Sequence, residues 1–241
     1  MKQLLYCVMD PKKFQEDESI VGVGSQRIIF LNGSDLCAAV SNFDNSETSF
    51  DVTSMITYHN VIETLFERLA IIPFRFRTLL NNKEEVLAML ETKNHDYKQL
   101  LLKLDGVIEI GIRLVSAKPA KDNTPQKNCL FKRPFKDSNP GTSYLANRKA
   151  FYSTASWIED QKKEFSELCV NQFKGLFVDL KSEAARLPEI QNRRDLMMIS
   201  IYFLVKKDLL QRFRYKFQEL RGVTPGKMLL SGPWPPYNFV V

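Results

Sequence analysis

Histidine and cysteine are scarce in this chain of 241 residues, and their spacing gives little support to a metal site or a disulfide framework. Both histidines, His59 and His95, lie among polar residues of predicted helices. The cysteines are Cys7, Cys37, Cys129 and Cys169, and no two of them form a Cys-x-x-Cys pair. Zinc sites and disulfide frameworks depend on closer or more regular spacings of such residues. We therefore expect reduced thiols and no bound metal.

Long apolar runs are also missing. No segment approaches the roughly 18 consecutive apolar residues of a membrane-spanning helix. The N-terminal stretch MKQLLYCVMDPKK lacks the apolar core of about 7–15 residues that a signal peptide has. The sequence therefore predicts a soluble protein of the cytoplasm, or one that sits on an intracellular particle, with no membrane partner.

Recognisable catalytic motifs are absent from the sequence. No nucleotide-binding loop, nucleophile elbow or glycine-rich cofactor fingerprint occurs. The pair Gly22-x-Gly24 lacks the third glycine and the strand-to-helix context of a phosphate loop, so a turn explains it better. Acid–base chemistry would have to depend on carboxylates that nothing in the sequence marks out. The pattern favours a protein that is not an enzyme, binds no cofactor and has no small-molecule substrate.

The charge balance is basic but dispersed. The chain has 34 Lys and Arg against 28 Asp and Glu, for a formal net charge of +6 and a pI near 9.0. The basic residues are spread among acidic ones and form no single block. Such a balance suits an acidic or polar partner surface, and it is weak evidence for nucleic-acid binding, which typically uses a clustered basic patch.

The strands of the first half follow from short apolar runs. Residues 3–9, 27–31 and 36–43 indicate strands, and the last two flank Asn32-Gly33-Ser34-Asp35, which has the turn chemistry of a hairpin. Residues 74–78 alternate aromatic or hydroxyl residues with arginine, which predicts a short edge strand. Residues 1–105 are thus expected to form a small mixed α+β domain.

Two helices are predicted in the same half. Apolar residues recur at steps of three and four up to Leu69, which predicts a helix that begins near Asp51 or Thr53. A second helix should begin after Asn82, which with Glu85 makes a capping-box-like start, and should continue to residue 104 with a weak point at 92–94.

The second half, residues 106–241, alternates strands and helices in an order of its own. We predict a strand at 107–115, a long helix at 143–174, strands at 176–181 and 196–205, a helix at 206–220 and a strand at 228–230. Residues 116–139 show little periodicity and should form a variable loop. The order strand, helix, strand, strand, helix, strand is that of a ferredoxin-like domain. The predicted fold class is therefore α+β, with two domains.

The C-terminal stretch KMLLSGPWPPYNFVV contains more aromatic residues than is typical of a disordered terminus. Trp234, Tyr237 and Phe239 can each bury roughly 150–250 Å², and the prolines between them prevent a helix. We predict that the tail 231–241 docks on the domain. From spacing alone it could be a sheet edge whose aromatic residues fill a groove, or a proline-rich ligand for a partner.

Three segments together resemble the GvpL/GvpF family of gas vesicle accessory proteins. They are IPFRFRT at 72–78, PGTSYL at 140–145 and SGPWPPYNF at 231–239. In the first segment Pro73, Arg75, Phe76 and Thr78 match the family's Pro-x-Arg-Phe-Gly-Thr-like motif. Arg77 stands where the family favours glycine. Glu109 and Gly111 match a Glu-x-Gly strand of the family.

The resemblance implies a non-enzymatic accessory or minor structural protein needed for gas vesicle assembly, located at the gas vesicle. Its partners would be the small hydrophobic major shell protein and other accessory proteins, and it could prevent aggregation of shell subunits during nucleation. The candidate interface residues are Arg75, Phe76, Arg77, Trp234 and Tyr237. A purely structural role is the alternative for each of them.

Two other functions have weaker support in the sequence. A nucleic-acid-binding module could use the basic helix at 206–221, but its sheet would need stacking aromatics, and LMMISIYFLV offers only Tyr202 and Phe203, on opposite faces. An acylphosphatase-like enzyme would need an anion-cradling loop after the strand at 107–115, and residues 116–139 carry no glycine.

Overall fold

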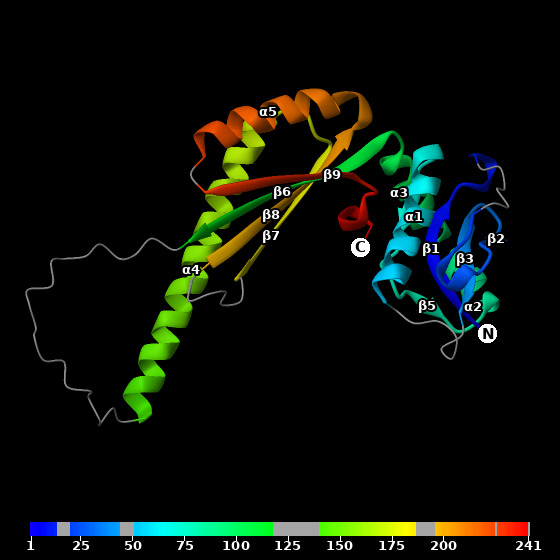
Figure 1. Ribbon diagram of the computed structural model, residues 1–241, viewed down its shortest axis with the longest axis horizontal. Coiled ribbons are helices and arrows are strands. Elements are labelled where there is room, and N and C mark those ends of the chain that lie inside the picture. The colour runs from blue at the N-terminus through cyan, green and yellow to red at the C-terminus, as the bar shows by residue number, and fades with distance from the viewer. Residues whose placement is uncertain (14–19, 44–50, 118–139, 187–195, 225, 241) are drawn as a thin grey trace, which may run out of the picture.

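Two antiparallel sheets, one from each half of the chain, form the fold, and helices pack against both (Figure 1). The computed structural model describes residues 1–13, 20–43, 51–117, 140–186, 196–224 and 226–240. It confirms the predicted mixed α+β class. Most of the predicted loop at 116–139 lies outside the described residues.

The first sheet is centred on β1 (Lys2–Met9), whose residues from Gln3 onward are all buried. The other strands are β2 (Ile29–Asn32), β3 (Cys37–Phe43), β4 (Ile71–Pro73) and β5 (Leu79–Leu80). Their order is β2-β3-β1-β4, and β5 also pairs with β1. The predicted strands at 3–9 and 36–43 are thereby confirmed, and their apolar runs match mostly buried positions. The strand predicted at 27–31 is also present, but it spans residues 29–32 and is only half-buried.

The helices of the first half begin where their capping residues predict. In α1 (Val52–Arg68) the Asp51 carboxylate accepts a hydrogen bond of 2.7 Å from the Ser54 amide. Asn82 does the same for α2 (Lys83–Thr92), at 2.8 Å from the Glu85 amide. The chain breaks at the predicted weak point, so that α3 (Asn94–Leu104) is a separate helix.

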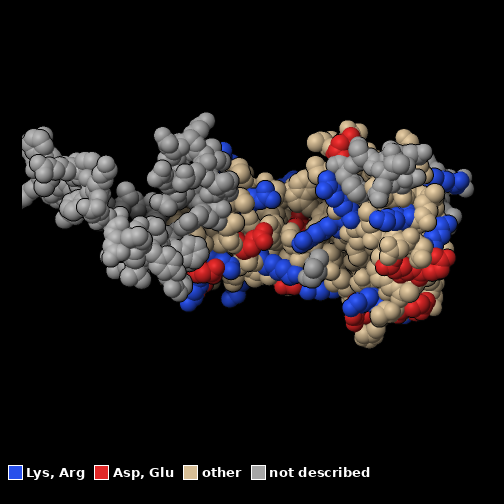
Figure 2. Space-filling view, turned by 90° about the horizontal axis from the view of Figure 1, so that it is seen from below, with Lys and Arg blue, Asp and Glu red and all other residues tan. Residues whose placement is uncertain are grey.

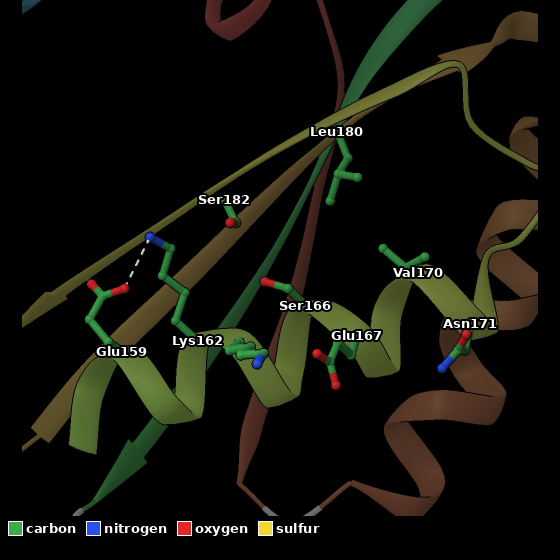
Figure 3. A pocket seen from close by; sticks show the side chains of 9 residues that line it. Glu159, Lys162, Ser166, Glu167, Val170, Asn171, Leu180 and Ser182 are labelled. Atoms are coloured by element: carbon green, nitrogen blue, oxygen red, sulfur yellow. Dashed lines mark ion pairs between the residues drawn. The ribbon is translucent and has the colours of Figure 1, made fainter. Parts of the chain in front are cut away.

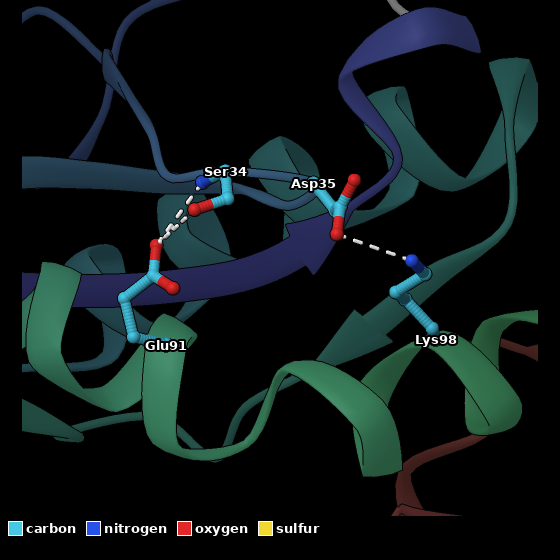
Figure 4. A network of polar contacts seen from close by, with 4 residues as sticks. All are labelled: Ser34, Asp35, Glu91 and Lys98. Carbon is cyan, nitrogen blue, oxygen red and sulfur yellow. Dashed lines mark hydrogen bonds and ion pairs between the residues drawn. The ribbon is translucent and has the colours of Figure 1, made fainter.

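The hairpin turn between β2 and β3 is tied to these two helices (Figure 4). The Glu91 carboxylate of α2 accepts hydrogen bonds from the Ser34 amide and hydroxyl, at 3.1 and 2.7 Å. The Lys98 ammonium of α3 lies 3.1 Å from the Asp35 carboxylate. The turn predicted from its Asn-Gly-Ser-Asp chemistry is thus held by side chains about 60 residues away in sequence.

The second sheet has the order β7-β8-β6-β9 and follows the predicted sequence of elements. Its strands are β6 (Val107–Ala117), β7 (Asp179–Arg186), β8 (Leu196–Lys206) and β9 (Lys227–Trp234). The helices are α4 (Pro140–Gln172) and α5 (Leu210–Val223), the latter after a 3₁₀ turn at Lys207–Leu209. The predicted strand at 176–181 begins instead at Asp179, because Gly175, with φ +78°, and a turn bond from the Leu176 amide to the Phe173 carbonyl follow α4.

Two clusters of buried apolar side chains run through the molecule, and each contains residues of both halves. In one, Phe173 of α4 stacks on Phe213 of α5 with ring centroids 4.2 Å apart, and both rings contact Phe203 of β8. In the other, Leu5 of β1 belongs to the same cluster as Phe239 of the C-terminal tail. Side chains far apart in sequence therefore hold the two sheets together.

Candidate functional site

Tyr58, in the middle of α1, is the buried centre of the site. Its ring is 2% exposed, stacks on Tyr6 with centroids 4.7 Å apart and contacts Phe76 at 5.3 Å. The hydroxyl donates to the Leu5 carbonyl at 2.7 Å, and the carbonyls of Phe74 and Arg75 lie within 3.3 Å. Burial raises the pKa of Tyr58 well above its ordinary value, so the hydroxyl keeps its proton for this bond.

The segment that carries Arg75, Phe76 and Arg77 is a turn, and the prediction of a strand at 74–78 is wrong. The amide and hydroxyl of Thr78 both donate to the Arg75 carbonyl, at 3.1 and 2.7 Å, which closes the turn. Arg77 adopts φ +76°, in the left-handed region that favours glycine. A glycine at this position would adopt such a φ without steric strain.

The side chains of this turn divide between the surface and the core. Arg75 and Arg77 are exposed, and the Arg77 guanidinium lies 5.8 Å from the Phe76 ring centroid. Phe76 itself is half-buried against Tyr58. Of these three candidates, the two arginines are therefore exposed to solvent, whereas Phe76 is largely covered by the core.

The C-terminal tail is docked, as predicted, and a buried carboxylate holds it. Glu109 of β6, 3% exposed, accepts hydrogen bonds from the amide and the side-chain Nδ2 of Asn238, at 2.8 and 2.6 Å. Burial raises the pKa of Glu109, and the two bonds from Asn238 act in the opposite direction. The next residue, Phe239, is buried in the cluster that contains Leu5. These contacts fix the tail against both halves.

Trp234 and Tyr237 have different surroundings. Trp234 is 37% exposed, and its ring lies 5.6 Å from that of His59 on α1. The His59 Nε2 lies 3.1 Å from the Glu63 carboxylate. Tyr237 is half-buried against the core, and burial raises the pKa of its hydroxyl. Of these two aromatic residues, Trp234 is therefore the one that faces outward.

The structure brings the two candidate segments together on one turn of α1. Tyr58 binds the 74–78 turn, and its neighbour His59 contacts Trp234, although the segments are more than 150 residues apart. We call this region, consisting of the turn 74–78, the tail 231–240 and the middle of α1, the α1 junction. The contact between His59 and Trp234 was not expected, since His59 lies among polar residues in the sequence of its helix.

A row of exposed apolar side chains leads to the junction and was missed in the sequence. Val52, Met55 and Ile56 are 67%, 49% and 53% exposed. With His59 they recur at steps of three and four, so they share one face of α1. We call the first three the α1 apolar stripe. Its signal was present in the sequence, because these residues lie off the buried face that contains Tyr58 and Val61.

A groove of about 410 Å³ borders the same helix on the side of the second sheet. Its lining residues are Glu63, Phe66, Glu67, Ile108, Lys207, Leu210, Pro233 and Pro235. The Lys207 ammonium lies 4.9 Å from the Phe66 ring centroid. The groove thus joins apolar walls to charges of both signs.

Charges of both signs also cover the wider surface. Figure 2 shows Lys and Arg interspersed with Asp and Glu over the face in view, without a block of one sign. On the second sheet, Tyr202 donates to the Glu183 carboxylate and Phe203 is fully buried among the helices. This arrangement leaves Phe203 unable to stack on a base, which the nucleic-acid alternative would require.

Within the described residues, no group of His, Cys, Asp and Glu has the geometry to hold a metal ion. Cys7, Cys37 and Cys169 are buried cysteines that form no disulfide among the described residues, and burial raises the pKa of Cys169 to about 12. None of the described helices has the length and apolar character that a membrane span needs. What the junction offers is apolar contact area with flanking arginines and carboxylates.

Comparison with known proteins relates nearly the whole chain to gas vesicle proteins. The family model "Gas vesicle synthesis protein GvpL/GvpF" matches residues 3–241. The crystal structure of the gas vesicle protein GvpF from Anabaena sp. PCC7120 superposes with a TM-score of 0.69 at 16% identity, covering 100% of this chain and 96% of that one. GvpF from Microcystis aeruginosa gives a TM-score of 0.70 at 13% identity, covering 100% and 99%. No curated protein matches the chain.

Proposed function

Because the chain belongs to the GvpL/GvpF family of gas vesicle synthesis proteins, we propose that it binds the hydrophobic major shell protein during gas vesicle assembly. The observation that supports this most directly is the α1 apolar stripe, with Trp234 on the same side of α1 beyond His59. Large apolar side chains gathered on one helix face are typical of protein–protein contact sites. The α1 junction is the proposed contact surface.

The chemistry of the junction suits an amphipathic partner. The stripe and Trp234 supply apolar area, while the exposed Arg75 and Arg77 of the turn and Glu63 of α1 supply charges of both signs within the junction. Aromatic and arginine side chains are the residues that most often dominate binding energy at interfaces. Covering apolar shell subunits in this way would keep them from aggregating before they assemble. The proposal needs no catalytic group.

Two further parts of the proposal concern organisation and partners. We interpret residues 1–105 and 106–241 as two domains, the second ferredoxin-like; the strand order β7-β8-β6-β9 and the φ of +70° at Gly106, between α3 and β6, support this. The protein would work at the gas vesicle and also contact other accessory proteins of the same assembly.

The test is co-expression with a gas vesicle major shell protein, followed by pull-down at moderate and high salt. Ile56→Asp places a charge within the α1 apolar stripe, and we expect it to reduce the captured shell protein at least fivefold at both salt concentrations. Arg75→Glu should weaken capture mainly at moderate salt, since a surface charge contact is screened at high salt. Trp234→Ala should reduce capture in the same way as Ile56→Asp.

The matched control is Leu102→Asp on α3, which changes an apolar side chain that is 71% exposed and lies away from the junction. Circular dichroism verifies that each variant keeps its fold. Equal loss of capture in Ile56→Asp and Leu102→Asp would remove the junction as the contact surface. Absence of capture by the wild type would refute direct binding of the shell protein.

A further inference from the structure

Strand β7 forms an open edge of the second sheet. It pairs with β8 along its whole length from Asp179 to Arg186, without a bulge. Among the described residues no strand pairs with its other side. The opposite edge, β9, carries Pro233 and a register irregularity beside Glu109 and Gly111, two features that obstruct edge pairing. The sequence DLKSEAAR of β7 contains neither proline nor glycine.

The two faces of β7 are chemically distinct. Leu180 and Ala184 point into the core beneath α4, together with Ser182 between them. Lys181 and Glu183 lie on the opposite face, where Lys181 is 5.7 Å from the Phe239 ring and Glu183 accepts a hydrogen bond from Tyr202. Both charged side chains remain exposed. An added strand must therefore match apolar groups on one face and charges on the other.

Antiparallel pairing with a second copy of β7 meets both demands in one register. A shift by one residue would put the apolar face of one copy beside the charged face of the other, so only registers that preserve the faces are possible. With Ser182 opposite Ser182, Leu180 faces Ala184 and Lys181 faces Glu183, and each pair occurs twice by two-fold symmetry. The alternative register with Glu183 on the two-fold axis is disfavoured, because it places the Glu183 carboxylates of the two copies directly opposite each other.

The helix side of the edge also has room for the partner strand. A groove of about 570 Å³ lies between α4 and β7 (Figure 3), where Val170 and Ser166 of the helix face Leu180 and Ser182 of the strand. The Ser166 hydroxyl is buried without a hydrogen-bond partner among the described residues. A fifth strand beyond β7 would direct every second side chain toward this groove.

We propose that the chain forms a two-fold symmetric dimer in which the β7 strands of two copies pair antiparallel with Ser182 at the axis. The second sheets then join into one continuous eight-stranded sheet, which follows from four strands in each copy. Two Lys181–Glu183 pairs select the register. The partner is a second copy because the charge pattern of β7 complements itself.

A charge exchange tests the pairing, with the dissociation constant measured by sedimentation equilibrium on the full chain. Lys181→Glu creates two carboxylate–carboxylate contacts, and Glu183→Lys creates two ammonium–ammonium contacts, so each should weaken the dimer about tenfold. The double variant Lys181→Glu/Glu183→Lys restores opposite charges and should return to within about threefold of the wild type. A mixture of the two single variants should form mixed dimers in preference to either like pair.

The two single variants change the net charge in opposite directions, so a common loss of association cannot come from overall charge. Lys227→Glu, at an exposed position of the other edge strand, is the matched control and should associate like the wild type. Thermal unfolding shows whether each variant is folded. A wild type that stays monomeric up to about 100 µM, single variants that associate unchanged, or a double variant that fails to recover would each overturn the proposal.

Discussion

The bond between Asn238 and Glu109 offers the sharpest test of how the C-terminal tail is held. Asn238→Ala removes the Nδ2 donor, 2.6 Å from the buried carboxylate, and leaves the backbone donor at 2.8 Å in place. Hydrogen bonds to charged groups contribute about 1.5–3 kcal/mol each. We expect the free energy of unfolding to fall by about 2 kcal/mol at pH 7. For a chain of this length that lowers Tm by about 4–8 °C.

The loss should depend on pH in a defined direction. Burial raises the pKa of Glu109, and removing a donor that favours the ionised form raises the folded-state pKa further. The folded variant then binds more protons than the unfolded chain between the two pKa values, so its stability falls as pH rises through that window. The deficit relative to the wild type is therefore largest at pH 7 and shrinks toward the unfolded pKa of about 4.3.

Urea unfolding followed by far-UV circular dichroism, at pH 7 and at pH 4.5, measures this difference between variant and wild type. Asn60→Ala is the matched control, since Asn60 is exposed in the middle of α1 and the change to Ala improves helix propensity. It should leave stability equal or slightly higher at both pH values. A deficit for Asn238→Ala below about 0.5 kcal/mol, or one that does not change with pH, would refute the reasoning.

Two further predictions concern the 74–78 turn. Arg77→Gly should be about 1 kcal/mol more stable than Arg77→Ala in urea unfolding, because glycine adopts the positive φ without strain. Both variants lose the contact with Phe76, so this contact does not affect the comparison. Equal stabilities of the two variants would contradict a strained backbone at Arg77. Tyr58→Phe should lower the free energy of unfolding by about 1–2 kcal/mol, since it leaves the Leu5 carbonyl buried without its hydrogen-bond donor. An unchanged urea midpoint would contradict this, because another group would then have to donate to that carbonyl.

Elements whose signal lies in their own sequence were predicted well. The alternation of Ile108, Ile110 and Ile112 identifies β6, because successive side chains of a strand point to opposite faces. The steps of three and four from Tyr58 to Leu65 identify α1 for the corresponding reason in a helix. Helix starts were found from Asp51 and Asn82, whose side chains bind amides three residues ahead. Such contacts are local, so one chain segment contains all the information.

The failures have a common physical origin in distant partners. Residues 74–78 alternate like a strand, yet Tyr58 binds the carbonyls of Phe74 and Arg75 from another element. Thr78 then closes the turn on Arg75, and Arg77 adopts a φ that its own propensity disfavours. Tertiary contacts outweighed a local pattern of only five residues. A short segment carries too little propensity to resist them.

The candidate site shows the same limit at larger scale. Aromatic content predicted a docked tail but could not tell which ring would be buried. The structure answers this through anchors elsewhere in the chain: Glu109 holds Asn238, and Leu5 shares a cluster with Phe239, so the tail is fixed on both sides. Trp234 precedes these anchors and lies against His59 at the surface. Its exposure is therefore determined by contacts that the tail makes beyond it, which no local pattern around Trp234 contains.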